Sequence, residues 1–192
     1  TAVFVHPLPF AGKSRQDKLA EVRAKMVTHK ADCHLLTSLD DIAWLFNIRG
    51  RDVEFCPVTL AFALIEHSSA HLFVASSKVP APVADELRAD GITLHEYDYI
   101  RGFLAARDVA HTVLLEPALV SKALADALPK DCKRVEEANP TRALKAVKND
   151  TELAGFRRCM VQDGVAMVRF LSWLEREVGS GRVSERSAQD QL

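Results

Sequence analysis

Two short groups of side chains have the types and spacing that metal binding or acid–base chemistry requires. His67 and His71 are four residues apart, and on a helix this spacing lets two imidazoles share one metal ion. Asp40 and Asp41 are adjacent carboxylates, which could act as a general acid and a general base. Residues 66–70 are polar and typical of a turn, however, and no acidic third ligand falls in register with the histidines. We therefore do not expect a metal site there.

The carboxylate pair also has a structural explanation. Ser38-Leu39-Asp40-Asp41 matches the S-x-x-[DE] capping box, in which side chains bind the free N–H groups of a helix start. Acidic residues in a first turn are further favoured by the helix macrodipole. We predict a helix start here rather than a catalytic pair.

The remaining histidines and the cysteines are predicted to have structural roles. Solitary histidines next to predicted strands indicate surface or strand-edge positions for His34, His95 and His111. The cysteines lack any C-x-x-C pair, which argues against a zinc ribbon and a disulfide-rich scaffold: Cys33, Cys56, Cys132 and Cys159. We expect four reduced structural thiols and a cytoplasmic location.

Composition narrows the class of protein. The 192 residues are 48% hydrophobic and 27% charged, as in a globular protein with a real core. Lys and Arg number 25 against 26 acidic residues, so no overall positive field favours nucleic acid. No apolar stretch reaches the roughly 20 residues that a bilayer requires, and the first residues lack a basic region followed by an apolar run. We expect neither a nucleic-acid nor a membrane partner.

The elements that would position these side chains follow from periodicity and turn residues. Residues 1–13 contain Pro7, Pro9 and Gly12 without a period, which indicates an interdomain linker. Ser14 can cap a helix over 15–29, whose apolar stripe is Leu19, Val22 and Met26. Two apolar runs, 58–65 and 71–75, have hairpin spacing. Helical segments then alternate with extended ones: helices at 82–89, 100–107 and 119–128, and strands at 92–95, 112–116 and 134–136. With a further strand at 33–37, this predicts an α/β lobe with a mixed sheet over residues 14–147.

A different pattern begins after residue 147. Asn149 can cap a long helix running to Val178 whose large apolar residues fall on one stripe: Leu153, Phe156, Met160, Met167, Leu171, Leu174 and Val178. Such a stripe must be buried against something. We expect residues 148–192 to be the first helical part of a larger domain whose remainder lies outside this sequence. The alternative is a terminal helix that packs on its own lobe or on a second subunit.

Several segments together resemble a known family. The longest is Leu36-Thr37-Ser38-Leu39-Asp40-Asp41-Ile42-Ala43-Trp44-Leu45-Phe46-Asn47-Ile48-Arg49-Gly50. Shorter ones are Phe10-Ala11-Gly12-Lys13-Ser14, Ala146-Val147-Lys148-Asn149 and Trp173-Leu174-Glu175. In this order they resemble the second lobe and first catalytic-domain helix of three-domain eukaryotic aminopeptidase P, in the creatinase/prolidase family.

That resemblance implies an activity for the parent protein. It implies a creatinase-type α/β lobe followed by a truncated pita-bread domain, in which two divalent ions, usually manganese, activate water. The substrates would be peptides with proline in second position, from which the N-terminal residue is removed, and the enzyme would be a homodimer. The metal ligands of that family lie downstream of residue 192, so no catalytic or metal-binding residue is assigned in this chain. We expect no metal ion to bind to the 192 residues themselves. A non-catalytic dimerisation or peptide-binding module, and a prolidase- or creatinase-type relative, are the alternatives.

The resemblance also implies a substrate-binding role for one loop, 47–57, which in related enzymes approaches the active-site cleft. Asn47, Arg49 and Asp52 are the candidate substrate-binding residues. Arg49 and Arg51 offer donors suited to a peptide carbonyl or carboxylate, whereas Asp52 and Glu54 could pair with an α-amino group. The alternative is a solvated turn in which Gly50 serves backbone conformation.

Overall fold

A six-stranded mixed sheet organises the first of two units in the computed structural model, which describes residues 1–192. The units are Thr1–Lys148 and Asn149–Leu192. The strand order is β6 (Ile92–His95), β5 (Ala70–Val74), β4 (Ala61–Glu66), β2 (Cys33–Leu36), β7 (Thr112–Leu115) and β8 (Lys133–Glu136). Strand β4 is antiparallel to β2 and β5, and the other neighbouring pairs are parallel. The predicted α/β lobe, mixed sheet and hairpin are confirmed.

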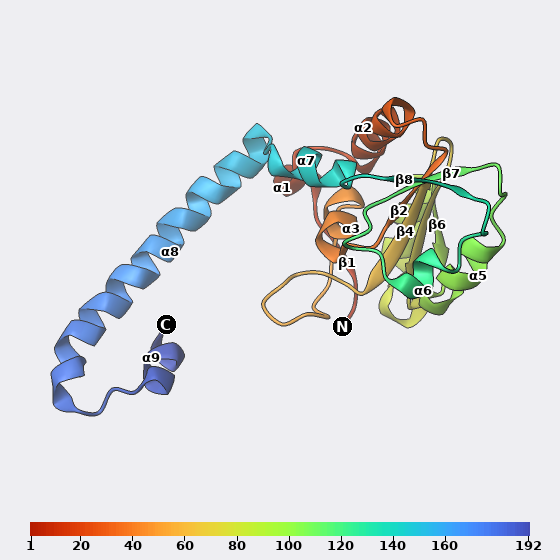
Figure 1. The fold of residues 1–192 in the computed structure, drawn as a ribbon. Helices are drawn as coiled ribbons and strands as arrows, with labels where there is room; N and C mark the ends of the chain where they lie inside the picture. Colours follow the sequence, from red (N-terminus) through yellow and green to blue (C-terminus); the bar gives the residue numbers. More distant parts are fainter. The chain divides into compact units, whose positions relative to one another are not determined.

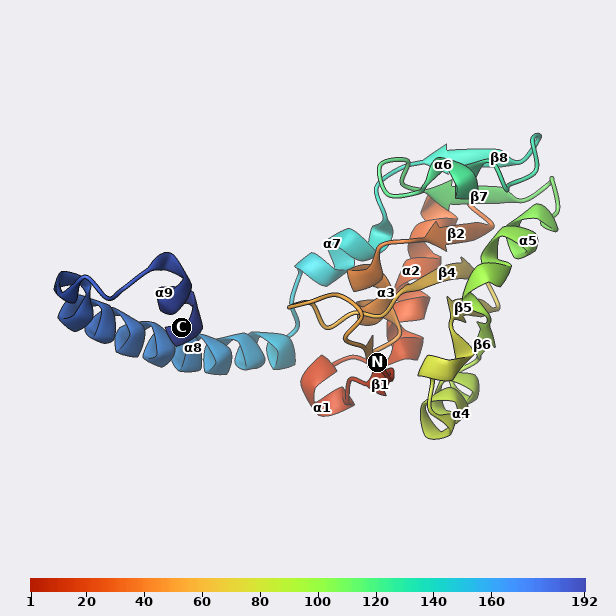
Figure 2. The same cartoon turned by 90° about the horizontal axis from the view of Figure 1, so that it is seen from below.

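Helices cover both faces of this sheet, because successive side chains of each strand point to opposite sides. On one face lie α2 (Arg15–Thr28), α3 (Leu39–Leu45) and α4 (Ala81–Ala89), packed on alternate residues such as Leu36, Ile65 and Leu72. On the other lie α5 (Ile100–Ala105) and α6 (Lys122–Ala125), packed on Leu35, Leu64 and Phe73. Figures 1 and 2 show α2 and α3 on the opposite side of the strands from α5.

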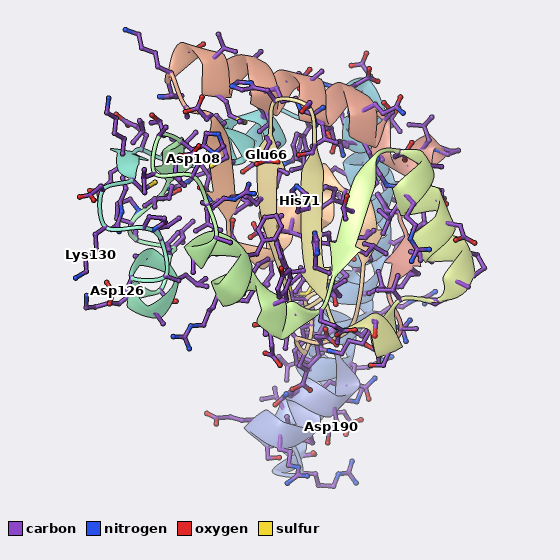
Figure 3. The ribbon with its side chains drawn as sticks, turned by 90° about the vertical axis from the view of Figure 1, so that its right-hand side faces the viewer. Glu66, His71, Asp108, Asp126, Lys130 and Asp190 are labelled. Atoms are coloured by element: carbon purple, nitrogen blue, oxygen red, sulfur yellow. The ribbon has the colours of Figure 1, made fainter.

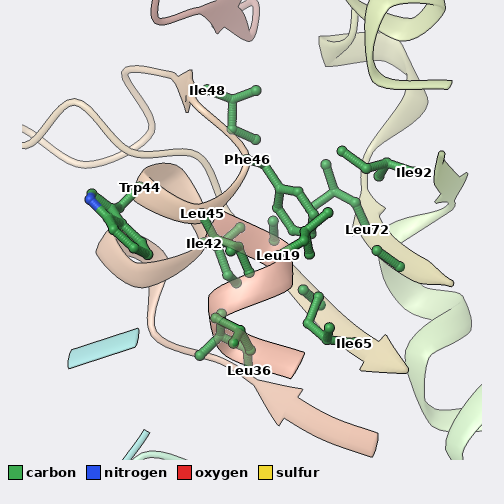
Figure 4. Packing of buried hydrophobic residues seen from close by; sticks show 14 of the residues in the cluster. Leu19, Leu36, Ile42, Trp44, Leu45, Phe46, Ile48, Ile65, Leu72 and Ile92 are labelled. Atoms are coloured by element: carbon green, nitrogen blue, oxygen red, sulfur yellow. The ribbon is translucent and has the colours of Figure 1, made fainter. Parts of the chain in front are cut away.

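The core of the first face is continuous from α2 to β6. Ser14 caps α2 by accepting a hydrogen bond from the Asp17 N–H, at 3.1 Å. Leu19, Val22 and Met26 are then buried, as their spacing predicts. Figure 4 shows Leu19, Phe46 and Leu72 packed between helix and strand. This core fixes the end of α3, from which the candidate loop starts.

Residues 1–13 are more ordered than the expected linker. They contain β1 (Phe4–Val5) and α1 (Leu8–Ala11), and β1 pairs antiparallel with β3 (Ile48–Arg49). Val3 and Ala11 are buried. The segment therefore belongs to the first unit, and the missed signal is a two-residue strand too short to show a period.

The start of α3 differs from the predicted capping box. Ser38 stands at the N-cap, but its hydroxyl donates to the Asp41 carboxylate at 2.5 Å instead of accepting from the backbone. Lys145 lies 2.7 Å from the same carboxylate and also binds Asp40. Lys145 belongs to α7 (Pro140–Ala146), a helix that the sequence pattern did not reveal. The acidic pair thus attaches α7 to α3.

Burial sets the electrostatics of that attachment. Asp41 is buried, and desolvation alone would raise its pKa. The hydrogen bonds from Lys145 and Ser38 outweigh this effect, so that the pKa of Asp41 is lowered. Asp41 is accordingly a charged anchor at neutral pH.

The second unit consists of α8 (Asp150–Glu177), η3 (Val178–Ser180) and α9 (Glu185–Gln191). Asn149 and Glu152 form a reciprocal capping box: Asn149 Oδ1 accepts from the Glu152 N–H at 2.9 Å, and the Glu152 carboxylate from the Asn149 N–H at 3.0 Å. The predicted long helix is therefore confirmed. None of its residues is buried.

Candidate functional site

The loop between β3 and β4 is the candidate site. It leaves α3 through Phe46 and Asn47, passes along β3, and extends from the sheet before β4 begins, as Figure 1 shows. Asn47 has a φ of 49°, a left-handed conformation that asparagine tolerates better than most residues. The chain can therefore turn sharply from the helix into the loop.

Asn47 is buried at this turn and holds it through two side-chain hydrogen bonds. Its side-chain oxygen accepts a hydrogen bond from Lys18 Nζ at 2.6 Å, and its amide nitrogen donates to the Lys13 carbonyl at 2.9 Å. Lys18 is itself only 1% exposed, donates to the Trp44 carbonyl at 2.9 Å, and lies 4.4 Å from the centre of the Trp44 ring. Asn47 joins α2 to the start of the loop in this structure.

Arg49 also bonds to the backbone. Its Nη1 donates to the Ala43 carbonyl at 2.8 Å and to the Ile48 carbonyl at 2.9 Å. Ala43 lies in α3 and Ile48 in β3, so the bond to Ala43 fixes β3 against that helix. A contact of Arg49 with a substrate stays a prediction.

Asp52 closes the base of the loop. Its Oδ2 accepts hydrogen bonds from the Thr59 hydroxyl, the Leu60 N–H and Lys78 Nζ, each at 2.9 Å. Its side chain is 5% exposed. Burial alone would raise the pKa of Asp52, but the bonds from Leu60, Lys78 and Thr59 outweigh it and hold the pKa well below the usual range.

Gly50 is required at this base for space. A Cβ on residue 50 would lie 2.9 Å from Thr59 Cβ, closer than real Cβ contacts come, and 3.0 Å from the Val58 carbonyl oxygen, tighter than most of them. The two ends of the loop touch here, so close approach explains the glycine, and no left-handed conformation is involved.

The tip of the loop presents different residues. A bridge between Val53 and Cys56 makes the tip a tight turn, in which Phe55 has a φ of 60° and is 97% exposed. Arg51 and Glu54 are exposed beside it. A guanidinium, a carboxylate and an aromatic ring thus project from a fixed base. Phe55 is not predicted from the sequence, where its only signal is a large aromatic residue within a charged loop.

The other candidate residues do not join this site. His71 lies in β5 beside His95 of β6, with His71 Nδ1 3.0 Å from His95 Nε2, so the prediction that His95 is solitary is wrong. His34 is also not at a surface or edge. It is fully buried in the central strand β2, 3.1 Å from the Leu114 carbonyl, and burial lowers its pKa to about 4.

No group of three or more His, Cys, Asp or Glu residues in the chain is arranged to hold a metal ion. The donors on the loop fit the same conclusion, since Asp52 is already occupied by three hydrogen bonds. The four cysteines are free, with Cys33 and Cys132 buried and Cys159 exposed, and burial raises the pKa of Cys33 to about 12. No helix is long and apolar enough to cross a membrane.

Comparison with known proteins gives this fold a family context. The creatinase/prolidase N-terminal domain family matches residues 1–152. A probable Xaa-Pro aminopeptidase P of Coccidioides posadasii is 35% identical over 200 residues, covering 99% of this chain and 33% of that protein. The corresponding protein of Botryotinia fuckeliana is 36% identical over 192 residues, covering 95% and 29%. The chain thus spans about a third of the length of these relatives.

A solved structure extends the similarity to both units. The X-prolyl aminopeptidase of Caenorhabditis elegans, described as a cytosolic enzyme with a di-nuclear active site, is 26% identical with a TM-score of 0.89. The match covers 99% of this chain and 32% of that enzyme. The long helix α8 therefore has a counterpart there, together with the lobe.

Proposed function

The chain belongs to the creatinase/prolidase N-terminal domain family, and from this premise we propose that it is the non-catalytic part of a metal-dependent Xaa-Pro aminopeptidase. The parent enzyme would remove the N-terminal residue that precedes proline. The observation that carries the proposal is the 35% identity along 99% of the chain to a probable Xaa-Pro aminopeptidase P. The TM-score of 0.89 to the nematode enzyme supports it.

The role proposed for the chain itself is to shape the substrate cleft and to assist assembly. The parent enzyme would use two divalent ions, manganese in our proposal, to activate water, but the residues of this chain do not form a site for them. Its own contribution would be binding and positioning through the loop 47–57. We place the parent protein in the cytoplasm and propose that it is a homodimer.

The division of labour within the loop makes this role specific. Arg51, Glu54 and Phe55 are exposed at the tip, whereas Asn47, Arg49 and Asp52 are engaged in bonds at the base. At the tip, Arg51 would contact a peptide carbonyl and Glu54 an α-amino group. Phe55 would contact an apolar side chain. The base residues assigned from the sequence would act on substrate through the position of the tip.

The first test is the reaction of the full-length gene product. Its intact mass is expected to be about three times the 21.2 kDa of this chain, in line with the 33% coverage of the Coccidioides protein. With manganese added, it should hydrolyse X-Pro-X peptides. Cleavage of X-Pro dipeptides alone would identify a prolidase-type relative. A gene product of about 21 kDa that hydrolyses neither X-Pro-X peptides nor X-Pro dipeptides would favour the alternative, a non-catalytic dimerisation or peptide-binding module.

The second test separates tip from base in that full-length protein. Phe55→Ala should raise KM for X-Pro-X peptides several-fold while thermal stability and metal content stay unchanged. Arg49→Ala should raise KM and also lower stability by about 1 kcal/mol, because two backbone acceptors lose their donor. Unchanged kinetics in both variants would assign the loop to solvated surface.

A further inference from the structure

Two histidines, one carboxylate and several aromatic rings form a cluster on the sheet, outside the loop 47–57. His71 Nδ1 lies 3.0 Å from His95 Nε2, and His71 Nε2 lies 3.2 Å from the Glu66 carboxylate. The three residues come from β5, β6 and β4, neighbouring strands of one sheet. Figure 3 shows Glu66 and His71 side by side on these strands. The arrangement is a chain of hydrogen bonds from carboxylate to imidazole to imidazole.

Aromatic rings hold both imidazoles from the side of α5. Phe73 stacks on His95 with ring centres 4.8 Å apart and an interplanar angle of 19°. Phe103 of α5 lies 4.8 Å from His71 and 5.1 Å from His95, and Tyr99 of η2 (Tyr97–Tyr99) lies 5.8 Å from His95. The segment 97–105 therefore packs directly on the pair. Its docking includes these contacts with both imidazoles, beside the burial of Ile100 and Leu104 in the core of the same face.

The number of protons on the pair decides whether they can remain together. Glu66 accepts a hydrogen bond from His71 Nε2–H, which leaves His71 Nδ1 to accept one from His95 Nε2–H. One extra proton can be accommodated: it binds His95 Nδ1 while the Nε2 proton of His95 shifts to His71 Nδ1, so that His71 carries N–H on both nitrogens and donates to the unprotonated His95 Nε2. A second extra proton places two N–H groups face to face at 3.0 Å, where neither can accept.

We propose that the His71–His95 pair is a pH-sensitive latch, which holds η2 and α5 on the sheet until the second proton binds and then releases them. Double protonation replaces a hydrogen bond by repulsion between two cations, and charged imidazoles leave the aromatic rings for water. His95 is only half-buried, which gives solvent protons access to it.

The charges around the pair set the acid range of the latch. Glu66, from β4, places a negative charge beside the pair, and Arg107, which binds Glu66 and lies 4.6 Å from the Phe103 ring, places a positive charge there. The other titratable or charged groups are Tyr99 from η2, Glu96 beside His95, and Arg23 of α2, which donates to the Glu66 and Ser69 carbonyls. Burial, and then the charge of His71, lower the pKa of His95.

The direction of the pH dependence follows from the lowered pKa of His95. A folded state that holds His95 neutral binds fewer protons than the unfolded or released state, whose histidine titrates near its ordinary value of about 6.5. The contribution of the latch is therefore complete above about pH 6.5 and is lost as pH falls through the lower, folded value. Release of α5 is an acid-side event.

Hydrogen exchange of the 192-residue chain, corrected for the intrinsic pH dependence, tests the latch. Between pH 7.5 and 5.0, amides of residues 97–107 should lose protection by up to about tenfold per pH unit for each proton taken up, while those of β2 and β4 keep theirs. His95→Phe should remove this pH dependence, because an aromatic ring then fills the site without titrating. His71→Gln provides the same test should that variant fail to fold.

The matched control is His67→Gln, which removes an exposed histidine of the neighbouring turn and should leave the pH dependence intact. Equal protection of 97–107 at both pH values in the unmodified chain would overturn the proposal. So would a pH dependence that persists in both His95→Phe and His71→Gln. The experiment uses no peptide substrate, so its outcome is independent of the proposed aminopeptidase function.

Discussion

Helices α2 and α8 carry the same kind of apolar stripe, but the stripe is buried in α2 and exposed in α8. Both begin at a capped residue, Ser14 and Asn149, and both repeat large apolar residues at spacings of three and four. In α2 the stripe of Leu19, Val22 and Met26 is at most 2% exposed. In α8 Met160 is 59% exposed and Leu171 54%. Periodicity thus predicts that one face of a helix is a packing surface. It does not predict whether the residues that cover this face belong to the same unit.

The largest expected effect concerns the exposed stripe of α8. Each large apolar side chain left in water forgoes roughly 1.5–3 kcal/mol of burial, so several together exceed the usual stability margin of a small domain. We expect the 192-residue chain to self-associate through this helix, with light scattering across a dilution series giving a mass above the 21.2 kDa monomer.

Substitutions on two faces of α8 identify the surface responsible. Met167→Glu with Leu171→Glu should restore monomers, because burying two carboxylates costs more than the contact returns. The control, Gln162→Glu with Arg169→Glu, adds the same number of carboxylates at other exposed positions of α8 and should leave association unchanged. A monomer at high concentration in the unmodified chain would mean that the helix instead folds back on its own lobe.

How far the sequence predicts the fold differs between elements for physical reasons. Capped amphipathic helices such as α2 and α8, and the β4–β5 hairpin, follow from side-chain types because their signals are local. Strand β1 and helix α7 were missed because their stability comes from partners distant in sequence, β3 for one and Asp40 and Asp41 for the other. Their own residues show little periodicity.

The candidate site divides in the same way. Resemblance located the loop 47–57, but the residue types alone could not separate base from tip. Asp52 looks like a free carboxylate in the sequence, and only the fold brings Lys78 and Thr59 to it. The His71–His95 contact was missed because the two strands, adjacent in the sheet, are separated by a helix in sequence.

The next effect sharpens the comparison of the two stripes by deleting the same atoms in each. Leu19→Ala, at a position of the α2 stripe with 2% exposure, should cost about 2–5 kcal/mol of unfolding free energy, because it leaves a cavity in the core. Leu171→Ala should change the unfolding free energy of the first unit by less than about 0.5 kcal/mol. Chemical denaturation followed by tryptophan fluorescence measures both, with Trp173→Phe in each protein so that Trp44 alone reports on the first unit. Equal losses would mean that α8 is part of the same cooperative core.

The smallest effect tests whether the loop base belongs to the well-packed region despite its position outside the sheet. Asp52→Asn removes the charge that accepts from Lys78, Thr59 and the Leu60 N–H, and should cost about 1–3 kcal/mol at pH 7. Because the folded pKa of Asp52 is depressed, its contribution is present above the unfolded value near pH 3.9 and is lost as pH falls through the folded value.

The difference in unfolding free energy between Asp52→Asn and the unmodified chain should therefore be constant from pH 7 to about pH 5 and should shrink below about pH 4. Other titrating groups, including Asp41 and His95, are common to both proteins and cancel in the difference. Glu54→Gln, an exposed carboxylate of the same loop, is the matched control and should change stability by less than about 0.5 kcal/mol at either pH. A gap that stays constant down to pH 3 would show that the side-chain shape of Asp52, and not its charge, holds the base of the loop.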